Sequence, residues 1–185
     1  YVEYGLIAII LTLIIISGEI DLSIASMIAL TAVIFGTAYN AGLGMPISML
    51  IALFSGTLCG LFNGILVTQL QIPSIILTIG TLTLYRGIAQ SLASDFSLGG
   101  YPSWFIGIDY RYIGIVPIPV IIFTVFAIVV GFFLSSTIYG KQLYLIGTNP
   151  QTAKYSGIKV DRIKLLLFTL SGLVCGIAGV LTTSR

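Results

Sequence analysis

Histidine is absent from this chain, and charged residues of either sign are scarce. Only 8% of the 185 residues are Asp, Glu, Lys or Arg, whereas a soluble domain carries about 25%. The lack of histidine excludes histidine chemistry and most zinc sites. A net charge of +2 without a basic face gives no indication of nucleic-acid binding.

The sequence also lacks the groups that an enzyme or an ATPase would need. The phosphate-binding pattern G-x-x-x-x-G-K-[ST] is missing, and the short "YGKQ" does not supply it. If ATP drives a process here, another polypeptide must bind it. A membrane enzyme would need clustered nucleophiles, bases or metal ligands, and so few acids without histidine argue against one. The two cysteines, Cys59 and Cys175, lie in apolar runs and are predicted to be packing residues.

Apolar residues are what the chain has in excess. They make up 57% of it, with a mean hydropathy of +1.12, which is more than one soluble core can bury. A membrane-spanning helix needs about 20 apolar residues, and backbone in lipid must satisfy its hydrogen bonds within the helix. We therefore predict an all-α, polytopic membrane bundle of about six helices. Their expected ranges are 4–17, 22–39, 45–68, 72–93, 112–134 and 164–181.

The distribution of charge predicts how this bundle is oriented. Residues 135–164 carry five basic side chains against one acid, Asp161, whereas residues 94–111 carry Arg111 against Asp95 and Asp109. The positive-inside rule places the first stretch in the cytoplasm and the second outside. The basic residues are Lys141, Lys154, Lys159, Arg162 and Lys164. The outer stretch and its end are rich in aromatic side chains typical of headgroup depth, namely Tyr101, Trp104, Tyr110 and Tyr112.

Glycines recur at helical spacing in two of the predicted spans. Such faces allow close approach of helix backbones, which matters in lipid because the hydrophobic drive between helices is weak. The alternative is the ordinary abundance of glycine in membrane helices. The packing candidates are Gly56, Gly60 and Gly64 in one span and Gly172, Gly176 and Gly179 in another.

A short polar stretch, "GTNPQTAKYSG", lies between two apolar runs in the basic region. Asn149 suits a helix N-cap, Pro150 the first helical position and Gly157 the position after the end, so a two-turn helix is predicted over 150–156. A helix this short needs something to pack on. We interpret it as a docking element for a soluble partner; the alternative is a loop that folds back on its own membrane domain.

Polar residues within or near the spans are the candidates for a transport pathway. For Glu19 and Asp21 we favour a solvated cytoplasmic turn over a broken helix that lines the pathway. Asp21, followed by Ser23, is also a candidate cap of the next helix. Arg86 either snorkels to the outer headgroups or faces the pathway. Asn63 is expected to form an interhelical hydrogen bond. The full set is Glu19, Asp21, Ser23, Asn63, Thr78, Thr81 and Arg86.

Three stretches, in order along the chain, resemble the permease subunits of bacterial ABC importers for simple sugars such as ribose, xylose, rhamnose, galactose or autoinducer-2. They are "SGEIDLSIASMIALTAVIFG", "GLFNGILVTQLQIPSIILTIGTLTLYRGIA" and "GKQLYLIGTNPQTAKYSGIKVDRIKLLLFTLSGLVCGIAGVL". The family belongs to a superfamily that also contains branched-chain amino acid permeases. Glu19 is a departure, since the family more often has a small residue or Asn before "IDLS".

The resemblance implies a single permease domain over residues 1–185, part of a protein of roughly ten helices, with a cytoplasmic coupling loop over 135–163. It implies no cofactor on this chain, with ATP and Mg²⁺ bound by a separate ATPase subunit. Further implied partners are a second permease copy or paralogue, an external sugar-binding protein and the lipid of the bacterial inner membrane. The coupling helix that contacts the ATPase would include Gly147, Asn149, Pro150, Ala153, Tyr155, Ser156 and Gly157.

A second hypothesis is a secondary transporter or channel driven by an ion gradient. It predicts acidic residues within the spans as proton or sodium sites. The sequence shows none in mid-helix. ATP dependence and an obligatory ATPase partner would distinguish the two hypotheses.

Overall fold

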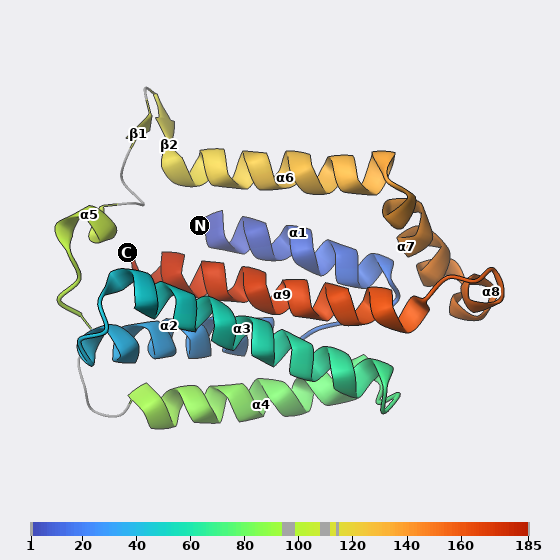
Figure 1. The fold of residues 1–185 in the computed structure, drawn as a ribbon, viewed down its shortest axis with the longest axis horizontal. Helices are drawn as coiled ribbons and strands as arrows, with labels where there is room; N and C mark the ends of the chain where they lie inside the picture. Colours follow the sequence, from blue (N-terminus) through green and yellow to red (C-terminus); the bar gives the residue numbers. More distant parts are fainter. Residues whose placement is uncertain (1, 94–98, 108–111, 114, 185) are drawn as a thin grey trace.

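The computed structural model describes residues 2–93, 99–107, 112–113 and 115–184. Long helices lie side by side along one axis, and short elements cover the two ends of the bundle (Figure 1). The helices are α1 (Val2–Ile16), α2 (Ile24–Asn40), α3 (Met45–Thr68), α4 (Ser74–Ala93), α5 (Ser103–Ile106), α6 (Ile118–Ser136), α7 (Ile138–Thr148), α8 (Pro150–Tyr155) and α9 (Val160–Thr183). A two-residue antiparallel hairpin, β1 (Tyr112–Ile113) and β2 (Val116–Pro117), precedes α6.

Four helices, α3, α4, α6 and α9, are long and apolar enough to cross a membrane. The expected six spans are completed by α1 and α2, which are apolar but only 15 and 17 residues long. The prediction for 112–134 was wrong at its start, where Tyr112–Ile113 and Val116–Pro117 are strands and the helix begins at Ile118. Pro117 and Pro119 explain the shift, because proline is tolerated only before or within the first helical turn.

One end of the bundle carries α7 and α8, where the predicted cytoplasmic basic residues lie (Figure 1). The whole of 135–163 was expected to be a loop around one short helix, which missed α7. This helix turns Gly140, Leu143 and Ile146 inward at a spacing of three residues. Its first turn is capped by the Thr137 hydroxyl, which accepts the Gly140 N–H at 3.1 Å.

The other end of the bundle carries α5 and the hairpin. The ring of Tyr101 lies 5.5 Å from Phe35 and 5.1 Å from Tyr39, between ring centroids, so this end is tied to α2 by aromatic contacts. Trp104 and Tyr112 are exposed, as expected for side chains at headgroup depth. Tyr110, Arg111, Asp95 and Asp109 lie outside the described residues.

The centre of the bundle is the contact between α3 and α9. A Cβ atom on Gly60 would lie 2.2 Å from the Phe168 carbonyl oxygen, and one on Gly172 would lie 2.1 Å from the Gly56 carbonyl oxygen. The two glycine faces therefore meet backbone to backbone. Gly64 approaches the side chains of Leu165 and Phe168, Gly176 approaches Leu53, and Gly179 instead faces Thr31 of α2.

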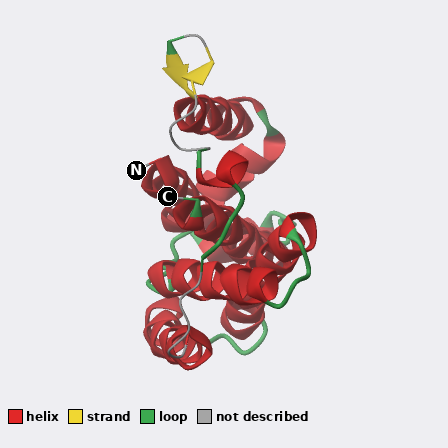
Figure 2. Ribbon diagram, turned by 90° about the vertical axis from the view of Figure 1, so that its left-hand side faces the viewer, coloured by secondary structure: helices red, strands yellow, loops and turns green. Residues whose placement is uncertain are grey.

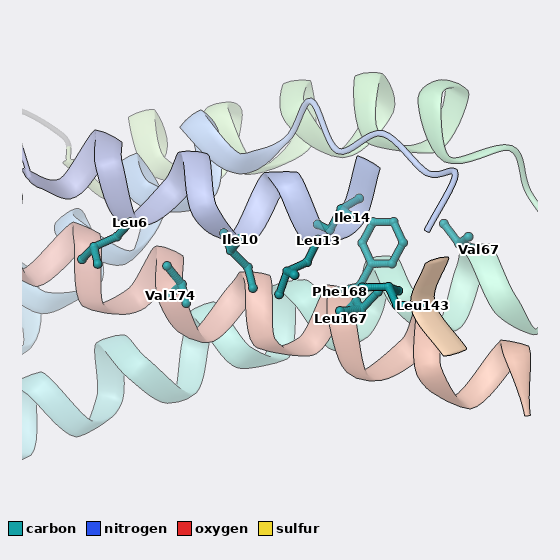
Figure 3. Packing of buried hydrophobic residues seen from close by; sticks show 9 residues of the cluster. All are labelled: Leu6, Ile10, Leu13, Ile14, Val67, Leu143, Leu167, Phe168 and Val174. Atoms are coloured by element: carbon teal, nitrogen blue, oxygen red, sulfur yellow. The ribbon is translucent and has the colours of Figure 1, made fainter. Parts of the chain in front are cut away.

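Around this contact, α1 packs along α9. Figure 3 shows their shared apolar cluster, in which Leu6, Ile10, Leu13 and Ile14 of α1 meet Leu167, Phe168 and Val174 of α9, with Val67 of α3 and Leu143 of α7. The helices α6 and α4 form opposite edges of the bundle (Figure 2). Their outward faces are lined by exposed aliphatic and aromatic side chains, as lipid or further helices require.

Candidate functional site

The short helix α8 has the start and the end that its sequence predicts. The Asn149 Oδ1 atom accepts the backbone N–H groups of Gln151 and Thr152, both at 3.0 Å. Pro150 occupies the first turn, and Gly157 has a φ of +80°, which favours glycine. The helix ends at Tyr155 and Ser156 is its C-cap, one residue earlier than the predicted end. These caps fix a two-turn helix at the basic end of the bundle.

The two sides of α8 have different surroundings. Ala153 is 3% exposed and packs with Ile146 of α7 and Val160 of α9, whereas Tyr155 is 91% exposed. Ser156 and Gly157 are also exposed. Helix α8 is therefore held by the membrane domain through one face and presents the other to solution.

Gly147, the first of the predicted coupling residues, is exposed, but it lies against the end of α1. A Cβ atom there would lie 1.9 Å from the Ile16 carbonyl oxygen at the end of α1. This position therefore allows α7 to approach α1. Any side chain at this position would disturb the fold before it could affect a partner.

The segment 17–23, between α1 and α2, differs from the sequence-based prediction. It is not helical, and it returns from the end of α1 toward α2 as a blue thread in Figure 1. Its side chains alternate: Asp21 and Ser23 are 3% and 0% exposed, while Ile20 and Leu22 point outward. The favoured solvated turn was wrong, because Asp21 and Ser23 are buried and the segment is bonded to α3, α4 and α9.

Asp21 begins a chain of hydrogen bonds through the bundle. Its Oδ1 atom accepts the Ser23 N–H at 2.9 Å and the Ser23 hydroxyl at 2.6 Å. Asn63 of α3 donates its Nδ2 to the Ser23 hydroxyl oxygen at 2.9 Å, and the Tyr85 hydroxyl of α4 donates to Asn63 Oδ1 at 3.0 Å. Ser23 is the N-cap of α2 by position, but its side chain makes no capping hydrogen bond, and the Asp21 carboxylate accepts the N–H of Ser23 itself. The interhelical hydrogen bond expected of Asn63 is confirmed.

Tyr85 was missed by the sequence reasoning. A tyrosine in an apolar helix carries no signal of which face it occupies, and only its spacing of four residues from the buried Thr81 and Ala89 indicates the inward stripe. The second oxygen of Asp21, Oδ2, is buried without a hydrogen-bond partner among the described residues. The Asp21 carboxylate therefore accepts hydrogen bonds through only one of its two oxygen atoms among the described residues.

Helix α4 holds the extended segment from another side. The Ile20 N–H donates to the Ser74 hydroxyl at 3.2 Å, and the Thr78 hydroxyl lies 3.4 Å from the Ile20 carbonyl oxygen, besides its 2.7 Å bond to Ser74 O. Thr81 is buried on the same stripe. Arg86 is exposed on α4, so the structure does not bring it to the Asp21 network. Of the pathway candidates, Arg86 is therefore exposed and the others are buried or largely buried.

Two ion pairs lie at the basic end. Glu19 of segment 17–23 pairs with Lys164 of α9, and their side chains are 15% and 13% exposed. Lys154 of α8 pairs with Asp161 of α9 at 3.2 Å, and both side chains are about half exposed. A cavity of about 230 Å³ lies between the two pairs. Its lining comes from the α3–α4 connection, α8 and α9 and includes Thr68, Gln71, Pro73 and Pro150.

No set of three His, Cys, Asp or Glu side chains that could hold a metal ion is found within 2–93, 99–107, 112–113 and 115–184. The polar groups described here can form hydrogen bonds with hydroxyls.

Comparison with known proteins decides the family. The sequence model of the family described as "Branched-chain amino acid transport system / permease component" matches residues 2–185. The chain belongs to this family. It is a permease component with several membrane helices, and its place is the inner membrane.

Relatives of this permease component include proteins named "Autoinducer 2 import system permease protein LsrD". Those of Escherichia coli K12, Escherichia coli O157:H7 and Shigella flexneri are each 35% identical to it over 192 aligned residues. The alignment covers 100% of this chain and 58% of each relative, so the chain spans about three fifths of their length. No solved structure matches.

Proposed function

We propose that this chain is the transmembrane permease subunit of an ATP-driven importer for a monosaccharide or sugar-like small molecule. Family membership and the likeness to LsrD support the importer class, and the name of that relative makes autoinducer-2 the first substrate to test. ATP and Mg²⁺ would be bound by a separate ATPase on the cytoplasmic side. An external binding protein would deliver the substrate, and a second permease copy or paralogue would complete the pore.

The observation that carries this proposal is the two-sided helix α8. Tyr155 offers a nearly fully exposed aromatic side chain on a helix that is capped by Asn149 and anchored by Ala153. Aromatic side chains that can be buried against a partner dominate binding energies. The ATPase would thus push on a rigid element, and Ala153, Ile146 and Val160 would pass that movement to α7 and α9.

The buried polar network would provide the pathway. Asp21, Ser23 and Asn63 supply oxygen and nitrogen atoms inside an otherwise apolar bundle. A sugar needs such modest hydrogen-bonding groups and no strong binding site in order to pass. Thr78 and Thr81 of α4 extend the polar lining on the neighbouring side.

The docking role is tested with Tyr155→Asp in the full-length protein, co-expressed with the ATPase encoded beside it. We expect at least about a tenfold loss of co-purified ATPase, because an interface anchor is removed and a charge is buried. Tyr139→Asp is the matched control, since Tyr139 is exposed on α7 at the same end of the bundle. Gly147 and Ala153 are unsuitable sites, because a side chain at Gly147 would meet the Ile16 carbonyl group and Ala153 is buried.

Equal ATPase binding by Tyr155→Asp and wild type would show that α8 is not the contact. If wild type binds no ATPase, the importer proposal fails. Uptake of labelled autoinducer-2 and ribose into proteoliposomes, with and without ATP, then identifies the substrate class.

A second candidate is a transporter driven by an ion gradient, and one observation favours it. Asp21 is an acid inside the bundle with one unpartnered oxygen, which is the kind of group that such transporters use for a proton or sodium ion. Uptake that needs an ion gradient and ignores ATP would establish this alternative.

A further inference from the structure

The ion pair between Glu19 and Lys164 joins parts of the protein that are 145 residues apart in sequence. Both side chains are largely buried, so the pair is weakly screened by solvent and salt. Removal of one partner would leave the other charge without compensation in a poorly solvated place. The pair therefore constrains the relative position of its two backbones far more than the exposed Lys154–Asp161 pair can.

On the Lys164 side, the pair is connected to α8. Lys164 lies in the second turn of α9, and the start of α9 is attached to α8 by the contact of Val160 with Ala153 and by the Lys154–Asp161 pair. A displacement of α8 would therefore move the Lys164 ammonium group.

On the Glu19 side, the pair is connected to the buried network. Glu19 is followed by Ile20, which is bonded to Ser74, and by Asp21, which is bonded to Ser23. From Ser23 the hydrogen bonds continue to Asn63. A displacement of Glu19 would therefore reach the groups at the centre of the bundle.

Other contacts are poorly suited to carry this movement. Helices α3 and α9 meet through glycine backbones with no room for adjustment, so the two helices move as one body. Within segment 17–23, the N–H groups of Ser17, Gly18 and Glu19 are bonded to carbonyl oxygens at the end of α1, and Ser23 is bonded to Asn63 of α3. The Glu19–Lys164 pair is the ion pair that joins the beginning of this segment directly to α9.

We propose that Glu19 and Lys164 are positioning residues for import: their ion pair makes the buried segment 17–23 follow the movement of α8 and the start of α9. This inference rests on the proposed importer function.

The first test measures the tie itself and needs no transport activity. Hydrogen–deuterium exchange of residues 17–23 is followed in the full-length protein in lipid nanodiscs. We expect exchange to become at least about tenfold faster in Glu19→Gln and in Lys164→Met, because the segment is released. The reversed pair, Glu19→Lys with Lys164→Glu, should restore slow exchange. Lys159→Met, which removes an exposed cation from the same end, should leave it unchanged.

The second test measures coupling in proteoliposomes with the ATPase and the binding protein, and autoinducer-2 is the transported probe. In the single variants we expect ATPase co-purification as in wild type, but at least about a fivefold fall in autoinducer-2 transported per ATP hydrolysed. The reversed pair should restore the ratio, which a general loss of stability would not allow.

Each result has one interpretation. Unchanged exchange in both single variants overturns the proposal, and so does faster exchange with an unchanged transport-to-ATP ratio. If the wild-type protein binds no ATPase, both the proposed importer function and the coupling role of the pair fail. The exchange data still decide whether the ion pair holds segment 17–23 in place. A reversed pair that behaves like the single variants would show that local packing, and not the charge pair, is responsible.

Discussion

Helices α9 and α6 are both long apolar spans, yet they occupy opposite situations. Half of the most apolar part of α9 is buried inside the bundle, against 6% for α6, although α6 is the more apolar helix. Hydrophobicity therefore does not decide which helix is central. In lipid, apolar side chains gain little by leaving one apolar environment for another.

Glycine and polar residues make the difference between the two helices. Gly172, Gly176 and Gly179 allow α9 to touch the backbones or side chains of α2 and α3, whereas a Cβ atom on Gly131 of α6 would meet nothing within 4 Å. The Cys175 carbonyl oxygen of α9 also accepts a hydrogen bond from the Thr31 hydroxyl of α2. Close approach and hydrogen bonds hold the centre, and α6 keeps its apolar face for lipid or for helices outside this chain.

The largest effect is expected from filling the α3–α9 contact. Gly60→Leu should cost about 3 kcal/mol or more of unfolding free energy, because a side chain would overlap the backbone of Phe168. Gly131→Leu on α6 should leave stability nearly unchanged. Denaturation by SDS in mixed micelles compares the two. Similar losses in both variants would remove the distinction between the helices.

A smaller effect is expected from the buried network. Asn63→Ala should cost about 1–3 kcal/mol, because Ser23 loses a donor inside the bundle and the Tyr85 hydroxyl is left with Cys59 O as its one acceptor. Gln90→Ala, at an exposed position of α4, is the control and should change little. The same denaturation assay applies. An Asn63 variant as stable as wild type would mean that its hydrogen bonds are exchanged for others without cost.

The smallest effect concerns a single hydroxyl. Thr31→Val should cost about 0.6 kcal/mol or less, since the Thr31 hydroxyl shares its hydrogen between Cys175 O at 3.2 Å and Ile28 O of its own helix at 3.0 Å. Thr124→Val on α6 should be neutral, because the Thr124 hydroxyl bonds only to Val120 O of its own helix. The difference between the two variants isolates the interhelical part. A larger loss at Thr124 would contradict the peripheral place of α6.

The sequence predicts the elements whose signals are local. Apolar runs indicate where the spans lie, the Asn149–Pro150 and Gly157 signals define α8, and glycine spacing identifies the faces that meet between α3 and α9. Each of these depends on residues within a few turns of one another. Local sequence patterns were enough for these elements because the contacting helix face is already defined by residue spacing within one helix.

The sequence did not predict features that depend on distant partners. The pattern "SGEIDLS" is typical of a polar turn, and only Ser74, Asn63 and Lys164, from three other helices, make burial of that segment possible. Helix α7 was missed because its apolar positions belong to a short helix inside a basic stretch. The close approach of Gly147 to α1 also depends on where α1 ends.

The pairing of α3 with α9 has a consequence for synthesis. Residues 69–159 separate the two helices, so a ribosome adding about 5–20 residues per second needs roughly 5–18 s after α3 is complete before α9 begins to appear. During that interval, α4 and α6 enter the membrane while the glycine face of α3 still lacks its partner. The glycine face of α3 therefore cannot reach its final packing until α9 has been synthesised.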